Sequence, residues 1–136
     1  MKGGTAMKRL LAAIAAFGAA LPVAAEPVSG VTLFRQNCAT CHGLDARGNG
    51  PMAGVLSVAV PDLTGLAAAA GGAFPMAEVV AVIDGRRAFP AHGGPMPIFG
   101  FTLSGEMVVL TPPAGGEIAT SQEIAALAQW LESVQE

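Results

Sequence analysis

The apolar residues of this chain recur at helical spacing in three separate stretches. The first covers residues 30–40, the second 75–84 and the third 120–134. In each stretch one side of the helix is apolar, as in helices that pack one face on a core. The inward-facing positions are Val31, Phe34 and Cys38, then Val79, Val80 and Ile83, then Ile124, Leu127, Ala128 and Leu131. The pattern predicts a mainly helical protein.

Residues with capping side chains mark the ends of these helices. Ser29 has the side chain of an N-cap for the first helix. Pro75 suits the first position of the second helix, and Gly85 suits its C-terminal cap. Thr120 and Glu123 have the spacing of a capping box, which predicts that the last helix begins there.

The segments between the helices show no long periodicity. Residues 43–75 are rich in Gly, Ala and Pro, and we expect a loop with one alanine-rich turn at 66–70. A loop of this length is uncommon in a compact domain unless it serves a ligand. The sequence of residues 102–110 predicts a short hairpin around Ser104 and Gly105. The expected fold class is therefore all-α, with three to four short helices and long loops.

The first 25 residues have the layout of a secretory signal peptide. A basic start is followed by the apolar run 10–21, then by Pro22 and small residues up to Ala25. The run is shorter than the roughly 18–20 residues that cross a bilayer, although an uncleaved anchor is the alternative reading. We expect an exported protein with a signal peptide at 1–25, one domain at 26–136 and no membrane span after cleavage.

The expected mature domain is acidic. It has ten acidic side chains, four arginines and no lysine, which makes a formal charge of −6. This balance argues against nucleic acid and anionic lipid as partners, and it is compatible with a partner that has a positive patch. Simple solubility is the alternative explanation.

The only two cysteines of the chain belong to the motif Cys38-Ala39-Thr40-Cys41-His42. Cys-x-x-Cys-His is the attachment signature of c-type haem. Two thiols at this spacing can each add to one vinyl group of the porphyrin, and the adjacent imidazole then ligates the iron. The motif predicts one covalently bound haem.

Three other chemistries use a Cys-x-x-Cys pair. A structural disulfide would leave His42 without a role. A thioredoxin-like pair is expected within a βαβ pattern, which this sequence lacks. A zinc site needs four ligands, and only His42 and His92 are available besides the thiols.

Several stretches resemble the small bacterial class I c-type cytochromes, a family of monohaem domains. They are residues 30–43 with the haem motif, residues 84–86, residues 92–100 with Met96, and the C-terminal helix. The resemblance covers roughly 30–135 and is loose between these stretches. It implies a cytochrome c-like fold around one haem, periplasmic electron transfer and no catalysis by the chain itself. It also implies a close crossing of the first and last helices, with Phe34 against Leu127, Trp130 or Leu131.

Met96 is the expected distal ligand of the iron. Pro95 and Pro97 flank it and stiffen the segment, and a Pro-Met-Pro segment has this place in similar cytochromes. His92 is the competing candidate, because haems with two histidine ligands exist. Two weaker expectations concern the surroundings of the haem. The carbonyl of Pro51 would orient the His42 ring, as a proline carbonyl does in related cytochromes. Arg47, Arg86 or Arg87 would pair with the haem propionates.

The leading functional prediction is a free electron carrier whose partners are redox proteins, for example a dehydrogenase or an oxidase. One alternative is a cytochrome subunit permanently bound to a periplasmic dehydrogenase, which the missing lysines favour because soluble carriers often dock through a cationic rim. The other alternative is a gas-binding or peroxidatic haem with an open coordination site.

Overall fold

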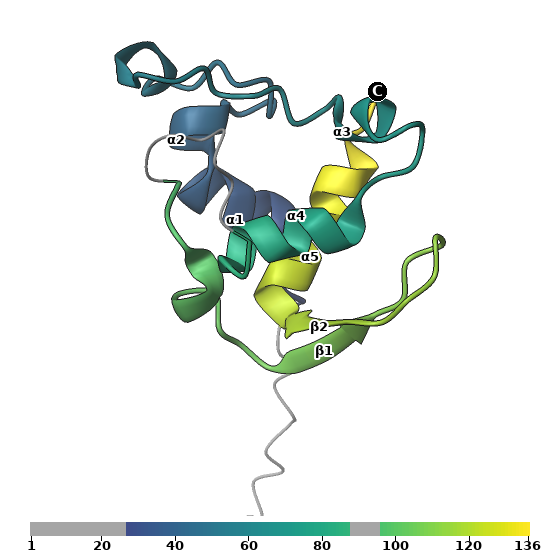
Figure 1. Ribbon diagram of the computed structural model, residues 1–136. Helices are drawn as coiled ribbons and strands as arrows, with labels where there is room; N and C mark the ends of the chain where they lie inside the picture. Colours follow the sequence, from purple (N-terminus) through teal and green to yellow (C-terminus); the bar gives the residue numbers. More distant parts are fainter. Residues whose placement is uncertain (1–26, 88–95) are drawn as a thin grey trace, which may run out of the picture.

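The computed structural model describes residues 27–87 and 96–136, which form a helical body with a small hairpin at one end (Figure 1). The two shortest helices are 3-10 helices, labelled η. In chain order the elements are α1 (Gly30–Asn37), α2 (Ala39–His42), η1 (Ala53–Val55), α3 (Leu66–Ala69), α4 (Met76–Asp84), η3 (Phe99–Phe101), β1 (Met107–Leu110), β2 (Ile118–Ser121) and α5 (Gln122–Ser133).

The crossing of α1 and α5 forms the centre of the core. A Cβ atom on Gly30 would lie 2.1 Å from the carbonyl oxygen of Ala126, so only glycine permits this approach. Further along α1, the Phe34 ring packs on the Trp130 ring with centroids 4.4 Å apart. The predicted contact between the first and last helices is therefore confirmed for Phe34 and Trp130.

Helix α4 packs beside this crossing and completes the core. Val79, Val80 and Ile83 are buried, as their spacing predicts. Gly85 ends the helix in the left-handed conformation with φ 83°, which confirms it as the C-cap. Pro75 is the N-cap and not the first helical residue.

The first predicted helix is interrupted at Cys38. Ser29 caps α1 as predicted, with its hydroxyl accepting a hydrogen bond from the Thr32 N–H at 3.3 Å. Cys38 then has φ −118°, and its N–H still donates to the carbonyl of Phe34 at 2.8 Å. The chain bends here and resumes as α2, which carries the second cysteine and His42.

The capping box prediction for the last helix is wrong by one residue. Thr120 lies in β2, and Ser121 is the N-cap of α5, with its side chain accepting from the Ile124 N–H. Glu123 reaches back to the N–H of Gly105 at 2.6 Å instead of to its own cap. Pairing of β2 with β1 extends the chain up to Ser121, and this delays the start of the helix.

The hairpin has different strands from those we predicted. β1 pairs with β2 in antiparallel register, with Met107 opposite Ser121 and Leu110 opposite Ile118. Gly115 and Gly116, both at positive φ, lie in the turn, whereas Ser104 and Gly105 lie before β1. The all-α prediction with three to four helices is thus correct only in part, because the described residues contain five α-helices and this two-stranded sheet.

The long loop after α2 runs over the top of the molecule to α4 (Figure 1). Besides η1 it contains α3, close to the predicted alanine-rich turn. The end of the chain holds this loop: the Gln135 amide accepts from the Ala67 N–H and donates to the Leu63 carbonyl, both at 2.8 Å. The Glu136 N–H donates to the Thr64 carbonyl at 3.0 Å.

The proposed signal peptide lies outside the described residues, so that prediction stays open. Among the residues that the structure describes, no helix is long and apolar enough to span a bilayer.

Candidate cofactor site

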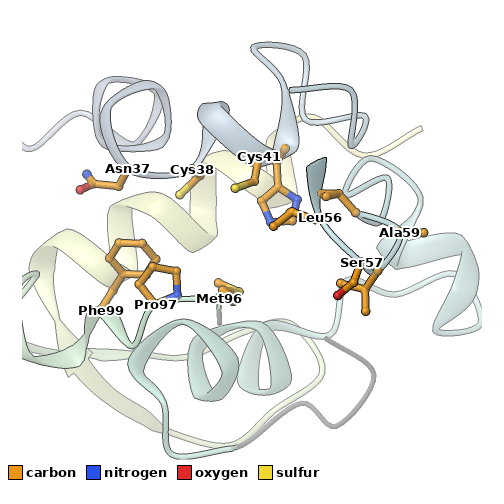
Figure 2. A pocket seen from close by; sticks show the side chains of 12 residues that line it. Asn37, Cys38, Cys41, Leu56, Ser57, Ala59, Met96, Pro97 and Phe99 are labelled. Atoms are coloured by element: carbon orange, nitrogen blue, oxygen red, sulfur yellow. The ribbon is translucent and has the colours of Figure 1, made fainter. Parts of the chain in front are cut away.

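Cys38, Cys41 and His42 line one side of a cavity of about 110 Å³, and Met96 lines it from a different segment. Figure 2 shows the thiol of Cys38, at the bend before α2, and the thiol of Cys41, in α2, pointing toward the space, with Met96 on the far side of it. The remaining lining residues are Asn37, Leu56, Ser57, Val58, Ala59, Val60, Pro97 and Phe99. None of them is charged.

A second cavity of about 170 Å³ adjoins the first and shares Cys38, His42, Met96 and Phe99 with it. It reaches into the core, where residues of α1, α4 and α5 line it, among them Phe34 and Leu127. The two cavities together describe an apolar slot between α2 and the segment of Met96.

The donor atoms along this slot suit a flat apolar group with a metal at its centre. Two thiols supply attachment points, and an imidazole and a thioether are both ligands that haem iron accepts. Apolar walls suit the porphyrin ring, so the residues present fit a c-type haem.

Backbone contacts fix the short helix that carries the motif. The N–H groups of Gly48, Gly50 and Met52 donate to the carbonyls of His42, Cys41 and Thr40 at 2.8, 3.1 and 3.0 Å. These bonds satisfy carbonyls that a helix end leaves without partners. A Cβ on Gly50 would lie 2.5 Å from the Thr40 oxygen, so a glycine is needed for this loop to come so close. The geometry of α2 is therefore held by the loop that follows it.

Both cysteines are free thiols in the structure. Burial, and then the neighbouring Cys41 thiol, raise the pKa of Cys38 to about 12. Since the thiolate is the form that reacts in disulfide exchange, the Cys38 thiol is poorly suited to a thioredoxin-like reaction. The raised pKa therefore argues against a thioredoxin-like role for the pair.

Met96 is half-buried, and the 3-10 helix η3 follows it closely, with Phe99 buried beside the cavity. The structure thus brings Met96 into the same cavity as His42. The competing ligand His92, and Pro95, lie outside the described residues.

Neither Pro51 nor the arginines considered for the propionates line the slot. Pro51 is exposed and lines a separate surface hollow with Arg35 and Asn49. Pro61, in contrast, lines the inner cavity with His42. The predicted role of the Pro51 carbonyl therefore stays a prediction.

Each of the three arginines considered for the propionates contacts carboxylates of the protein itself. Arg47 pairs with Glu136 and with Asp62, the latter at 3.6 Å. Arg86 pairs with Asp84, and Arg87 pairs with Glu78. None of these arginines lines either cavity of the slot.

Sequence reasoning missed the outer wall of the cavity. Residues 56–60 form it, and they come from the middle of the loop that we expected only to cover a ligand. The run Val58-Ala59-Val60 before Pro61 is the one signal in the sequence, and apolar content alone does not place it beside the cysteines.

Comparison with known proteins assigns the chain to a family. The family model of cytochrome c matches residues 28–135, which is most of the chain. No curated protein and no solved structure matches significantly. Members of this family bind c-type haem covalently, and Cys38 and Cys41 have the spacing of that attachment motif. The match together with the donor set of the slot shows that the chain belongs to the cytochrome c family, as a small class I c-type cytochrome with the cytochrome c fold.

Proposed function

We propose that this cytochrome is an exported one-electron carrier, with Cys38 and Cys41 attaching the haem and His42 and Met96 ligating its iron. The observation that carries the proposal is the meeting of these four side chains in one uncharged cavity. Membership of the cytochrome c family supports electron transfer as the general function.

The protein's own residues contribute position and exclusion of water. The loop 48–52 fixes the backbone of α2, the helix that carries His42. Leu56, Val60 and Phe99 give the slot apolar walls, which reduce its contact with water. When bound, the haem iron supplies the one-electron chemistry, and the chain tunes it through the axial ligands and the apolar surroundings.

The proposed export depends on the first 25 residues, whose pattern is that of a signal peptide. A periplasmic location follows from export in a bacterial host. Mass spectrometry of the mature haem protein tests this directly. A mass that begins at Glu26 supports the proposal, and a mass that includes the first 25 residues contradicts it.

Replacing Met96 tests the ligand set. We expect Met96→Ala to keep covalent haem, to lose the ferric charge-transfer band of methionine ligation, and to let the reduced protein bind carbon monoxide. The physical reason is that alanine has no donor atom, so one coordination position opens. Visible spectra and carbon monoxide titration measure the change.

Met107→Ala is the matched control, because Met107 is 67% exposed and lies in β1, away from the slot. Its spectra are expected to match those of the wild type. If Met96→Ala also leaves the spectrum unchanged, Met96 is not a ligand, and His92 becomes the candidate to test.

A second candidate function is that of a subunit permanently bound to a periplasmic dehydrogenase. The described residues hold nine acidic side chains, four arginines and no lysine. Three of the arginines, Arg47, Arg86 and Arg87, pair with carboxylates of the same chain. Such a surface lacks the cationic rim of a carrier that docks on acidic partners. Isolation of the native protein under mild conditions separates the two functions, since a subunit elutes with its enzyme and a carrier elutes alone.

A further inference from the structure

Neither outer edge of the hairpin has a paired strand within the described residues, and the register shows which backbone groups of β1 point outward. The Gln122 N–H donates to the Glu106 carbonyl at 2.7 Å, one step beyond the pair Met107–Ser121. Hydrogen-bonded and non-hydrogen-bonded pairs alternate along an antiparallel ladder. Residues 108 and 110 therefore bond to β2, while the N–H and C=O groups of Met107 and Val109 point to the opposite side. No other strand in the described part of the chain pairs with that side of β1.

The outer edge of β2 is protected against the addition of another strand, whereas β1 has no such protection. Ala119 is opposite Val109, so its carbonyl points outward from β2 by the same alternation. The Arg86 guanidinium donates to this carbonyl at 3.4 Å. Charged side chains at an edge are a common protection against the addition of another strand. β1 has the sequence Met-Val-Val-Leu and carries no such charge.

The outward face of β1 is also apolar. Met107 is 67% exposed and Val109 59% exposed, and the exposed Ala119 lies beside Val109 on the same face. Figure 1 shows the hairpin at the end of the molecule away from α2. A partner bound there would leave the haem slot accessible.

The charges around this edge indicate what it binds. Glu106 precedes β1, and Glu117 precedes β2 near the far end of β1, so an exposed carboxylate lies near each end of the paired ladder. A second copy would bring the same acidic side chains, and like charges facing each other oppose the pairing. A segment with basic residues at its ends complements these carboxylates.

We propose that the outer edge of β1 binds an extended, positively charged segment of a partner protein by strand addition. The backbone groups of Met107 and Val109 supply the hydrogen bonds, and Glu106 and Glu117 select the charge. The inference goes beyond electron transfer and does not depend on the identity of the axial ligands. It provides an anchor for the cytochrome that is separate from the haem slot.

A designed peptide tests the proposal on the reduced holo-protein. The probe is Lys-Lys-Val-Thr-Val-Thr-Val-Lys-Lys, an alternating strand with basic ends. We expect it to shift the amide NMR signals of Met107 and Val109 and to slow their hydrogen exchange. Two control peptides carry either glutamate in place of each lysine or proline in place of the central valine. Each control is expected to bind at least about tenfold more weakly, because it loses the charge match or a backbone donor.

The protein variants make the test specific to the edge. Val109→Lys places a charge on β1 and is expected to weaken binding of the lysine peptide by at least about tenfold. Val55→Lys is the matched control, since Val55 is 72% exposed in η1, and its binding is expected to stay within about twofold of the wild type. The haem spectrum of both variants reports whether the fold and the slot are intact.

Three results would overturn the proposal. The first is the absence of shifts at Met107 and Val109 at the highest soluble peptide concentration. The second is equal binding of the lysine and glutamate peptides. The third is a holo-protein dimer in sedimentation equilibrium that Val109→Lys dissociates, because a second copy would then occupy the edge. None of these results bears on the proposed ligands of the iron.

Discussion

Glycine at position 30 allows the two helices of the core to touch. Because a Cβ there would lie 2.1 Å from the Ala126 oxygen, Gly30→Ala forces α1 and α5 apart and disturbs the contact between Phe34 and Trp130. Overpacking of this kind costs about 1–3 kcal/mol. We expect Gly30→Ala to lower the free energy of unfolding by that amount, measured by urea unfolding of the holo-protein.

Gly54→Ala is the control for this substitution. A Cβ on Gly54, in η1, meets no atom within 4 Å. Its effect is expected to be within about 0.5 kcal/mol of zero. An equal loss of stability in both variants would mean that close approach at position 30 is not the cause.

At the residue scale, Cys38 and Cys41 are the proposed attachment points of the haem. We expect the double substitution Cys38→Ala with Cys41→Ala to abolish covalent haem, because both thioether bonds lose their sulfur. Haem staining after denaturing electrophoresis measures this, with the Met107→Ala protein as a positive control. Retention of stain in the double variant would refute the attachment sites.

At the scale of elements, the hydroxyls of Thr120 and Ser121 before α5 differ in their hydrogen bonding. The Ser121 hydroxyl donates to the Leu103 carbonyl at 2.5 Å and accepts from the Ile124 N–H at 3.3 Å. The Thr120 hydroxyl is buried and has no hydrogen-bond partner within the described structure. The first hydroxyl therefore stabilises the helix start, and the second carries a desolvation cost.

Substitution of these hydroxyls gives opposite predictions. Ser121→Ala is expected to cost about 1–2 kcal/mol through loss of the N-cap. Thr120→Val, which keeps the shape of the side chain, is expected to be neutral or stabilising because it removes an unsatisfied buried oxygen. Urea unfolding measures both. If Thr120→Val were the more damaging change, the capping box predicted from the sequence would be right after all.

The elements differ in how far local sequence determines them. The helix α4 and the body of α5 were predictable because their inward residues repeat at the helical period and contact the core on that face. The break at Cys38 and the one-residue shift at the start of α5 were not. Both depend on a partner distant in sequence, which is the loop 48–52 for α2 and β1 for Ser121.

At the scale of the whole molecule, the end of the chain ties the long loop to the helical body. Arg47 and Asp62 belong to the loop, and both lie within one ion-pair network with Glu136. Hydrogen bonds from the Thr64 N–H and hydroxyl, at 2.8 and 2.6 Å, hold the pKa of the Asp62 carboxyl below its usual value, and the Arg47 guanidinium adds a smaller effect.

This lowered pKa predicts how stability depends on pH. A carboxylate whose pKa is lower in the folded state stabilises the fold above its unfolded pKa of about 3.9, and this contribution is lost as the pH falls through the folded value. We expect Asp62→Asn to be less stable than the wild type at pH 7, with the difference shrinking as the pH falls below about 4. Urea unfolding of the holo-protein across this range measures the difference.

Glu117→Gln removes an exposed carboxylate in the hairpin turn and is the control. Its stability is expected to follow that of the wild type at every pH. A constant difference between Asp62→Asn and the wild type down to pH 2 would contradict a role for the Asp62 charge.

The covalent part of the site was predictable from sequence, because its chemistry lies within five consecutive residues. Two thiols and an imidazole at the spacing of Cys38 to His42 indicate haem attachment wherever the chain folds. The proposed ligand Met96 was a candidate for a similar reason, since Pro97 and Pro95 stiffen the segment locally. A short motif of this kind needs no knowledge of distant residues.

The sequence by itself determined the family, the attachment motif and the three helices that bury one apolar face. Only the tertiary structure decided that residues 56–60 line the cavity and that Arg47 and Arg86 contact carboxylates of the chain. It also decided that the outer edge of β1 pairs with no other strand among the described residues. The physical reason is the range of the interactions. Periodicity and motif chemistry act between neighbours along the chain, whereas walls, ion pairs and strand edges depend on which distant segments the fold brings together.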